Sequence, residues 1–278
     1  MVQAKKTSTK AWLVCLIAIF GGIALALVQN KISPIITVLM EVFNINMSTA
    51  GILSTIFTFI GLIMALPAAM ILKRFGPKRS GLAALLFAVL GSVVGLLTEN
   101  IAVLIASRVI EGTGIGIIAV LAPTLISMWF PPEKRGLPMG IWGSWMMVSQ
   151  AVLFFLGAPI THALGWQGMW MLGLVACIIA AVLFLLFVKS PPVGQSNADV
   201  ESSDVKILEG IKSFSSFTLA LAAACFTFCS FTFVSWVSAY WGTVTTWSVE
   251  EIGRWVAILY LVEMVYAWII GGILNKVK

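Results

Sequence analysis

Long apolar runs separated by short polar or charged stretches make up most of this 278-residue sequence. Most of these runs show neither the alternation of a half-buried strand nor the single apolar stripe of a soluble helix. Each is long enough to cross the hydrocarbon core of a bilayer as a helix, which takes about 20 residues. The pattern therefore predicts eight spanning helices, with approximate ranges 11–33, 49–72, 80–98, 101–129, 137–161, 167–189, 215–241 and 252–275.

Composition supports lipid as the solvent for these runs. Hydrophobic residues make up 60% of the chain and charged residues only 10%. A soluble domain of this length cannot hide so much apolar surface in one core. The predicted fold class is an all-α membrane protein.

The basic residues alternate in position along the predicted topology. They gather before the first helix and after the second, fourth, sixth and eighth, which puts them on one side of the membrane. Basic residues favour the cytoplasmic side, so the N-terminus is predicted to be cytoplasmic in a multi-pass cell-membrane protein. The net charge of +6 is then a signal of topology, and nucleic acid is not an expected partner.

The longest polar stretch, residues 190–213, separates six predicted helices from two. It carries both signs of charge, which is typical of a flexible cytoplasmic linker between two membrane bundles. The predicted organisation is a six-helix bundle over 1–189, this linker, and a second bundle that starts at 214 and runs to 278. A short amphipathic helix within the linker is a further prediction.

The turn between the second and third helices reads "AMILKRFGPKR". It resembles the G-x-x-x-D-R-x-G-R-[KR] hairpin of the major facilitator superfamily of secondary transporters, with Ala69 in place of the first glycine. Lys73 replaces an aspartate that in the family pairs with charges at the inward gate. The resemblance implies a gating hairpin made of Lys73, Arg74, Gly76, Lys78 and Arg79.

Further segments carry the same resemblance. "SRVIEGTGIG", residues 107–116, is similar to the family's R-x-x-x-G-x-G signature through Arg108, Gly112 and Gly114. The eighth helix also resembles the second helix in sequence, at an offset of 202 residues. It therefore corresponds to the second helix of a second, C-terminal half. The resemblance implies a complete N-terminal bundle and the first two helices of a C-terminal bundle. Because the family has twelve helices, the chain is expected to be truncated.

Three charged residues are predicted to lie within the membrane, where a charge costs about 2.5–3.5 kcal/mol on insertion scales. Arg108 and Glu111 are three residues apart, so they can pair on one helix face. They could face a water-filled cavity, where Arg108 binds substrate and Glu111 exchanges a proton. They could instead form a permanent ion pair that packs helices together. Glu263 is a second candidate for proton coupling, with a hydrogen bond to a neighbour as its structural alternative.

The first helix ends in "LVQNKISP". Anion-transporting branches of the family often place a basic residue here, and the resemblance implies a substrate-binding role for Lys31. A lysine near a helix end can also extend to the membrane interface. Gln29 and Asn30 could bind substrate or join helices. In the aromatic-rich seventh helix, Trp236 and Tyr240 are predicted to line the substrate site.

Together these features predict secondary active transport of a small molecule, most simply an organic anion, by alternating access in a cell inner membrane. The expected partners are this substrate, a proton in symport or a counter-substrate in exchange, and the lipid bilayer. A G-P-x-x-G ending of the fifth helix is missing from "LGAPITH", which disfavours drug–proton antiport. No motif predicts an enzyme, a metal site or a cofactor. The alternative is a non-transporting sensor or a degenerate remnant on the same scaffold, favoured by Lys73 and the expected truncation.

Overall fold

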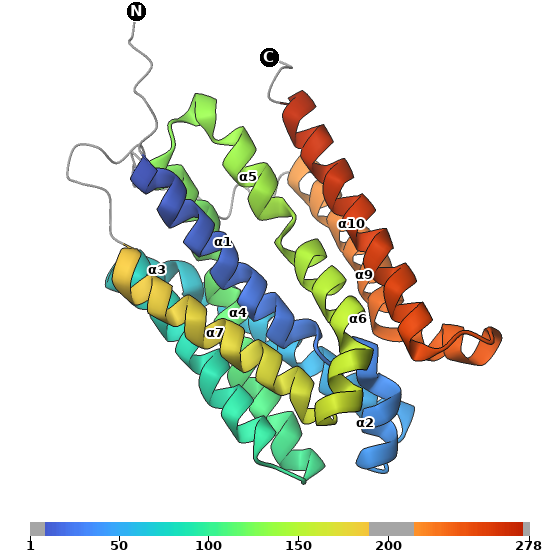
Figure 1. Cartoon of the computed structure of the whole chain (residues 1–278). Coiled ribbons are helices and arrows are strands. Elements are labelled where there is room, and N and C mark those ends of the chain that lie inside the picture. Colours follow the sequence, from blue (N-terminus) through green and yellow to red (C-terminus); the bar gives the residue numbers. More distant parts are fainter. Residues whose placement is uncertain (1–8, 189–213, 275–278) are drawn as a thin grey trace, which may run out of the picture.

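The computed structural model of this protein describes residues 9–188 and 214–274. The predicted linker 190–213 and its amphipathic helix lie outside these residues. Every regular element described is helical (Figure 1). The elements are α1 (Thr9–Asn30), η1 (Ser33–Ile35), α2 (Ile36–Val42), α3 (Met47–Leu96), α4 (Ile101–Trp129), η2 (Pro132–Lys134), α5 (Gly136–Gly143), α6 (Trp145–Leu164), α7 (Gln167–Phe187), α9 (Phe214–Val244) and α10 (Val249–Leu274).

The described part of the chain contains eight helical segments that are long and apolar enough to cross a membrane. This confirms the predicted all-α membrane fold class and the number of spans. Two spans are less regular than the apolar pattern indicated. The first continues past α1 through the short η1 turn, where Pro34 lies, into α2. The fifth is broken at Ser144 into α5 and α6.

α3 consists of two spans that meet at Gly76, the glycine of the predicted hairpin. Gly76 has φ +76° and ψ 168°, a conformation that side-chain-bearing residues rarely adopt. Phe57 and Gly91 lie on opposite sides of this kink, yet both approach α4 close to Gly112 and Glu111. The chain therefore folds back on itself at the position that the sequence predicted.

The cations of the hairpin lie around this kink. Lys73, Arg74 and Arg79 are exposed, and Lys78 is half-buried. None of the four forms an ion pair with a residue of the described chain. Arg74 contacts the ring of Phe75, with 5.4 Å from its guanidinium carbon to the ring centroid. The gating role of this hairpin stays a prediction.

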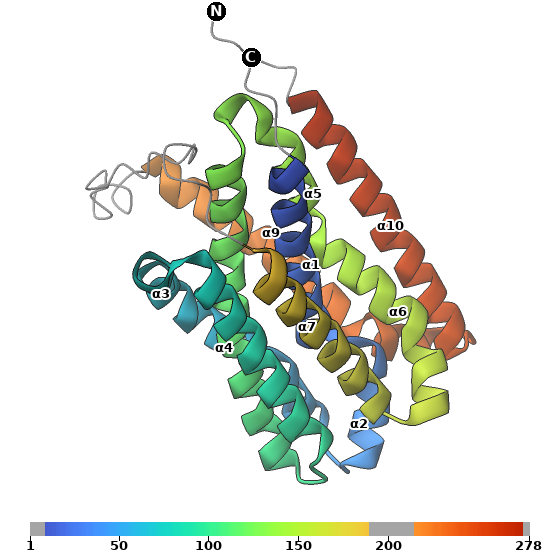
Figure 2. The same ribbon diagram turned by 60° about the vertical axis from the view of Figure 1, so that its left-hand side comes forward.

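α1 is the central helix of the first six spans and packs against α3, α4, α6 and α7. α9 and α10 stand beside this bundle on the side of α5 and α6 (Figures 1 and 2). α10 packs along α5 and α6, whereas most residues of α9 are exposed. The boundary between these two groups is where a cavity forms.

Candidate functional site: a buried charge network beside a cavity

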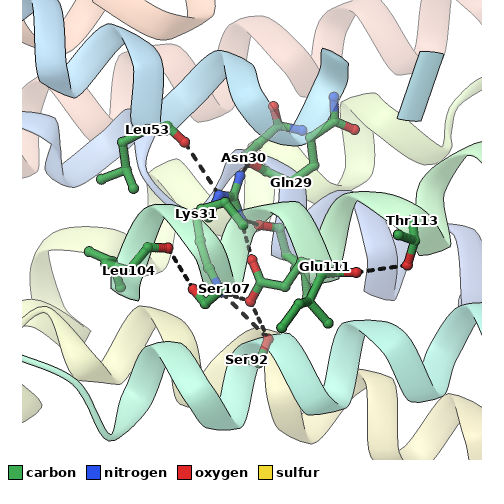
Figure 3. A network of polar contacts seen from close by, with 12 residues as sticks. Gln29, Asn30, Lys31, Leu53, Ser92, Leu104, Ser107, Glu111 and Thr113 are labelled. Carbon is green, nitrogen blue, oxygen red and sulfur yellow. Dashed lines mark hydrogen bonds and ion pairs between the residues drawn. The ribbon is translucent and has the colours of Figure 1, made fainter. Parts of the chain in front are cut away.

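Four side chains from α3, α4 and the turn after α1 form a buried polar cluster, which we call the charge network: Lys31, Ser92, Arg108 and Glu111. The Glu111 carboxylate accepts a hydrogen bond from Lys31 Nζ at 2.6 Å through Oε1 and one from Arg108 at 2.6 Å through Oε2. Ser92 donates a third, at 2.7 Å, to Oε1. Figure 3 shows Lys31 and Ser92 converging on Glu111. All three charged side chains have no exposed surface.

Lys31 enters this network because α1 ends one residue before it. The chain turns at Lys31 and Ile32 before η1 begins, and this turn directs the lysine side chain inward. Its Nζ lies 4.1 Å from the centroid of the Trp170 ring in α7, a favourable cation–π distance. Lys31 therefore does not extend to the membrane interface, and that alternative is wrong for this structure.

Arg108 joins α4 to the end of α1. Its guanidinium donates to the backbone carbonyls of Val28 and Gln29, both at 2.6 Å. These carbonyls belong to the last turn of α1, where the helix supplies no partner for them. The guanidinium carbon also lies 4.5 Å from the centroid of the Phe57 ring in α3. The planar, many-donor shape of arginine suits this combination of contacts.

The charge network holds two cations and one carboxylate if all three groups are ionised. Its excess positive charge is offset by the carbonyls of α1 and by the two aromatic rings. Burial of charges costs free energy unless every group has a partner, and here each one does. The geometry therefore resembles the ion-pair alternative for Arg108 and Glu111, extended by a third charged residue.

A cavity of about 600 Å³ lies between α6, α9 and α10, next to the end of α1. The α6 side contributes Met146, Met147 and Gln150. The lining from α9 and α10 is aromatic, aliphatic and weakly polar, and consists of Phe226, Thr227, Cys229, Ser230, Phe231, Phe233, Val234, Leu259, Tyr260 and Glu263. Asn30 completes the wall. Among the lining residues Glu263 is the one charged side chain.

The end of α1 contacts both features. The Gln29 carbonyl accepts from Arg108, and Lys31 binds Glu111, while Asn30 between them lines the cavity. Asn30 donates to the Ala26 carbonyl at 3.1 Å and approaches the sulfur of Met146 at 3.9 Å. Three consecutive residues therefore connect the charge network to the cavity wall.

The structure separates the residues that the sequence grouped as substrate-binding. Asn30 lines the cavity, as does Glu263 from the proton-coupling pair. Arg108 and Lys31 lie in the charge network, away from the cavity lining. Gln29 is buried and donates to Thr58 at 3.1 Å.

The two aromatic candidates of α9 also lie outside the lining. Tyr240 is 62% exposed, and Trp236 packs close to Gly51 of α3. For these residues the substrate-binding role stays a prediction that this conformation does not support.

Several lining residues were missed by sequence reasoning, above all Met146, Met147 and Gln150. One signal was present: Gln150 is an amide in the middle of an apolar run, where polar residues are costly. The cavity lining also includes Phe226, Phe231 and Phe233, which belong to the aromatic-rich seventh helix.

Comparisons with known proteins agree with this architecture. The family model of the Major Facilitator Superfamily matches residues 13–278. An uncharacterized MFS-type transporter of Bacillus subtilis, YhcA, is 30% identical over 190 residues, which are 67% of this chain and 36% of that relative. The multidrug efflux pump SdrM of Staphylococcus aureus is 31% identical over 156 residues, 55% of this chain and 35% of the pump.

Among solved structures, a D-xylose-proton symporter matches with a TM-score of 0.69 at 16% identity. The match covers 92% of this chain and 67% of the symporter. The chain thus matches little more than a third of the length of these curated relatives and two thirds of the solved structure. Fold, helix order and signature residues lead to the same assignment, and this chain belongs to the major facilitator superfamily.

Proposed function

We propose that this protein moves a small molecule across the membrane by alternating access, with the cavity between α6, α9 and α10 as the substrate site. The observation that carries this proposal is the end of α1, where Gln29, Asn30 and Lys31 contact both the cavity and the charge network. A change of charge in the network would move the cavity wall, which is what coupled transport requires. No enzyme activity is part of this function.

The lining of the cavity does not support an organic anion as the substrate. That prediction rested on Lys31 and Arg108, and both are buried and matched to Glu111. The lining contains no lysine or arginine, and it offers methionine, phenylalanine and small polar groups instead. We therefore propose an amphipathic solute with a large apolar part, because such linings bind apolar bodies and adapt to their shape.

We place proton coupling at Glu111, with Glu263 as the second candidate. Three donors point at the Glu111 carboxylate, so a proton that binds there would weaken its contacts with Lys31 and Arg108. Protonation without movement of these two side chains would leave two unmatched buried cations, which is strongly unfavourable. Proton binding at Glu111 and release of α1 from α4 would therefore occur together.

The direction of transport and the orientation of the chain in the membrane are also part of this proposal. A related protein is named for multidrug efflux, and a structural neighbour is named as a proton symporter. The first name supports outward transport and the second supports proton coupling. The excess of basic residues on one side supports a cytoplasmic N-terminus in the cell membrane.

Cys229 provides a direct test of the substrate site, since it lines the cavity, while Cys225 on the same helix does not. The purified chain in lipid nanodiscs would be labelled with N-ethylmaleimide in the presence and absence of naphthylethanol, a neutral amphipathic probe. We expect the probe to slow labelling of Cys229 and to leave the rate at Cys225 unchanged. If no amphipathic probe changes the rate at which Cys229 is labelled, the proposed site is contradicted.

Transport is tested separately, with the chain reconstituted in vesicles under an imposed pH gradient. Probe flux that responds to the gradient would support proton coupling, and loss of that flux in Glu111→Gln with protection of Cys229 retained would support coupling through the charge network. The alternative is a non-transporting protein, favoured by Lys73 and by hairpin cations that have no ion-pair partner in the described chain. Protection of Cys229 without any flux would favour that alternative.

A further inference from the structure

Glu263 has an unusual position for a carboxylate. It lies at the middle of α10, 14 residues after the helix starts at Val249, and it faces the cavity. It makes no hydrogen bond or ion pair with any residue of the described chain. Acidic residues within membrane spans are costly and mark sites that bind ions or polar groups. An unmatched carboxylate in this place suggests a partner from outside the chain.

A second acceptor without a partner belongs to the same cavity. Gln150 of α6 lines it and is only 6% exposed, yet its Oε1 atom has no hydrogen-bond partner within the described residues. A buried carbonyl oxygen without a donor is unfavourable, and native structures rarely leave one unexplained. Gln150 and Glu263 come from different helices, and each independently indicates that the cavity lacks a partner for its acceptors. The cavity contains too few hydrogen-bond donors and no positive charge.

The rest of the wall is suited to a bulky apolar group. Met146 and Met147 are flexible and polarisable, and Phe226, Phe231 and Phe233 present aromatic surface. Aromatic rings also attract cations over their faces. Tyr260, one turn before Glu263, stacks on Phe154 at 6.3 Å between ring centroids and so has a defined position in the wall.

We infer that the cavity binds an organic cation: an apolar or aromatic body that carries a protonated amine, whose N–H groups bond to the Glu263 carboxylate and the Gln150 carbonyl oxygen. This inference rests on the proposed substrate site and adds the chemical class of the substrate. Lys31 and Arg108 do not repel such a cation from within the lining, because they are buried outside it and paired with Glu111. The ammonium supplies both features that the wall lacks.

Three probes with the same ring and different head groups test this class. Naphthylethylammonium, naphthylethanol and naphthylacetate would be titrated against the purified chain in nanodiscs, with protection of Cys229 as the readout. We expect the ammonium to bind about tenfold more tightly than the alcohol, because a hydrogen bond to a charged group contributes that much, and the carboxylate to bind least. Equal binding of ammonium and alcohol, or a preference for the carboxylate, would overturn the inference.

Substitutions test whether Glu263 and Gln150 cause the preference for the ammonium probe. Glu263→Gln keeps the size of the side chain and should remove the preference for the ammonium, with binding of the alcohol changed less than about twofold. Gln150→Leu should reduce ammonium binding by a smaller factor. Glu99→Gln is the matched control, since it removes a carboxylate from an exposed position outside the cavity and should change nothing.

The outcomes separate the two proposals. Retained binding of the alcohol shows that a variant is folded and that the site exists. Loss of ammonium selectivity in Glu263→Gln alone supports the cation site, and unchanged selectivity refutes it while the substrate site stands. If none of the three probes protects Cys229 in the unmodified chain, the substrate site itself fails.

Discussion

The charge network and the cavity each contain a carboxylate in the middle of a membrane span, yet the two carboxylates have opposite environments. Glu111 accepts hydrogen bonds from Lys31, Ser92 and Arg108 and has no exposed surface. Glu263 faces a cavity and has no partner in the described chain. Both cost free energy on insertion into the membrane. Internal partners offset that cost for Glu111, whereas Glu263 depends on water, a proton or a ligand.

This difference predicts that Glu111 stabilises the folded protein, whereas Glu263 is available to bind a ligand. A fully matched buried carboxylate holds helices together, and its removal exposes the charges that it neutralised. A carboxylate without partners contributes little to folding and is free to bind something else. Substitutions in the charge network should therefore lower stability far more than a substitution of the cavity carboxylate.

Glu111→Gln should have the largest effect. It leaves Lys31 and Arg108 buried without a counter-charge, and breaking a buried pair in this way costs about 3–5 kcal/mol. The measurement is the thermal unfolding of the purified chain in detergent. Lys31→Met is the matched control, because it leaves Arg108 and Glu111 paired with equal and opposite charges. Its loss of stability should therefore be much smaller. Equal losses in the two variants would contradict the charge argument.

Arg108→Lys should come next, although it keeps the positive charge. A lysine ammonium is a compact point charge, so it cannot bind Glu111 and the carbonyls of Val28 and Gln29 with the same planar fork. We expect a loss of about 1.5–3 kcal/mol, the typical contribution of hydrogen bonds to charged groups. Denaturant titration monitored by tryptophan fluorescence would measure it. Stability equal to the unmodified chain would show that charge alone matters.

Gly112→Ala tests the helix packing on which the charge network depends. A Cβ at Gly112 would lie 2.6 Å from the Phe57 carbonyl oxygen of α3, closer than real contacts allow. Overpacking of this kind costs about 1–3 kcal/mol. Gly242→Ala is the control, since a Cβ there meets nothing within 4 Å. If both variants melt at the same temperature as the unmodified chain, the close approach of α3 and α4 is not required for stability.

Glu263→Gln should have the smallest effect on stability, within about 0.5 kcal/mol of the unmodified chain, because it breaks no hydrogen bond or ion pair in the described chain. The same thermal measurement applies, and the difference from Glu111→Gln compares the two carboxylates directly. A loss of several kcal/mol would mean that Glu263 has a structural partner, and the cavity would then lose its candidate recognition group.

The hydrophobic pattern was sufficient to predict the eight spans, and the range 101–129 matches α4 residue for residue. The sequence also located the hairpin, since only a glycine readily adopts the conformation found at Gly76. The pairing of Arg108 with Glu111 was accessible for a similar reason, because residues three apart on a helix are neighbours. All of these features depend on local geometry.

Which distant residues meet depends on helix packing in three dimensions. Lys31 and Glu111 are 80 positions apart, and no periodicity connects them; their contact exists because the chain turns after α1 beside α4. The same turn buried the cations expected to attract an anion, and the packing of α9 and α10 on the six-helix bundle created a cavity whose charged group is Glu263. Hydrophobicity fixes how often a chain crosses the membrane, but the chemistry between the helices depends on which faces pack together.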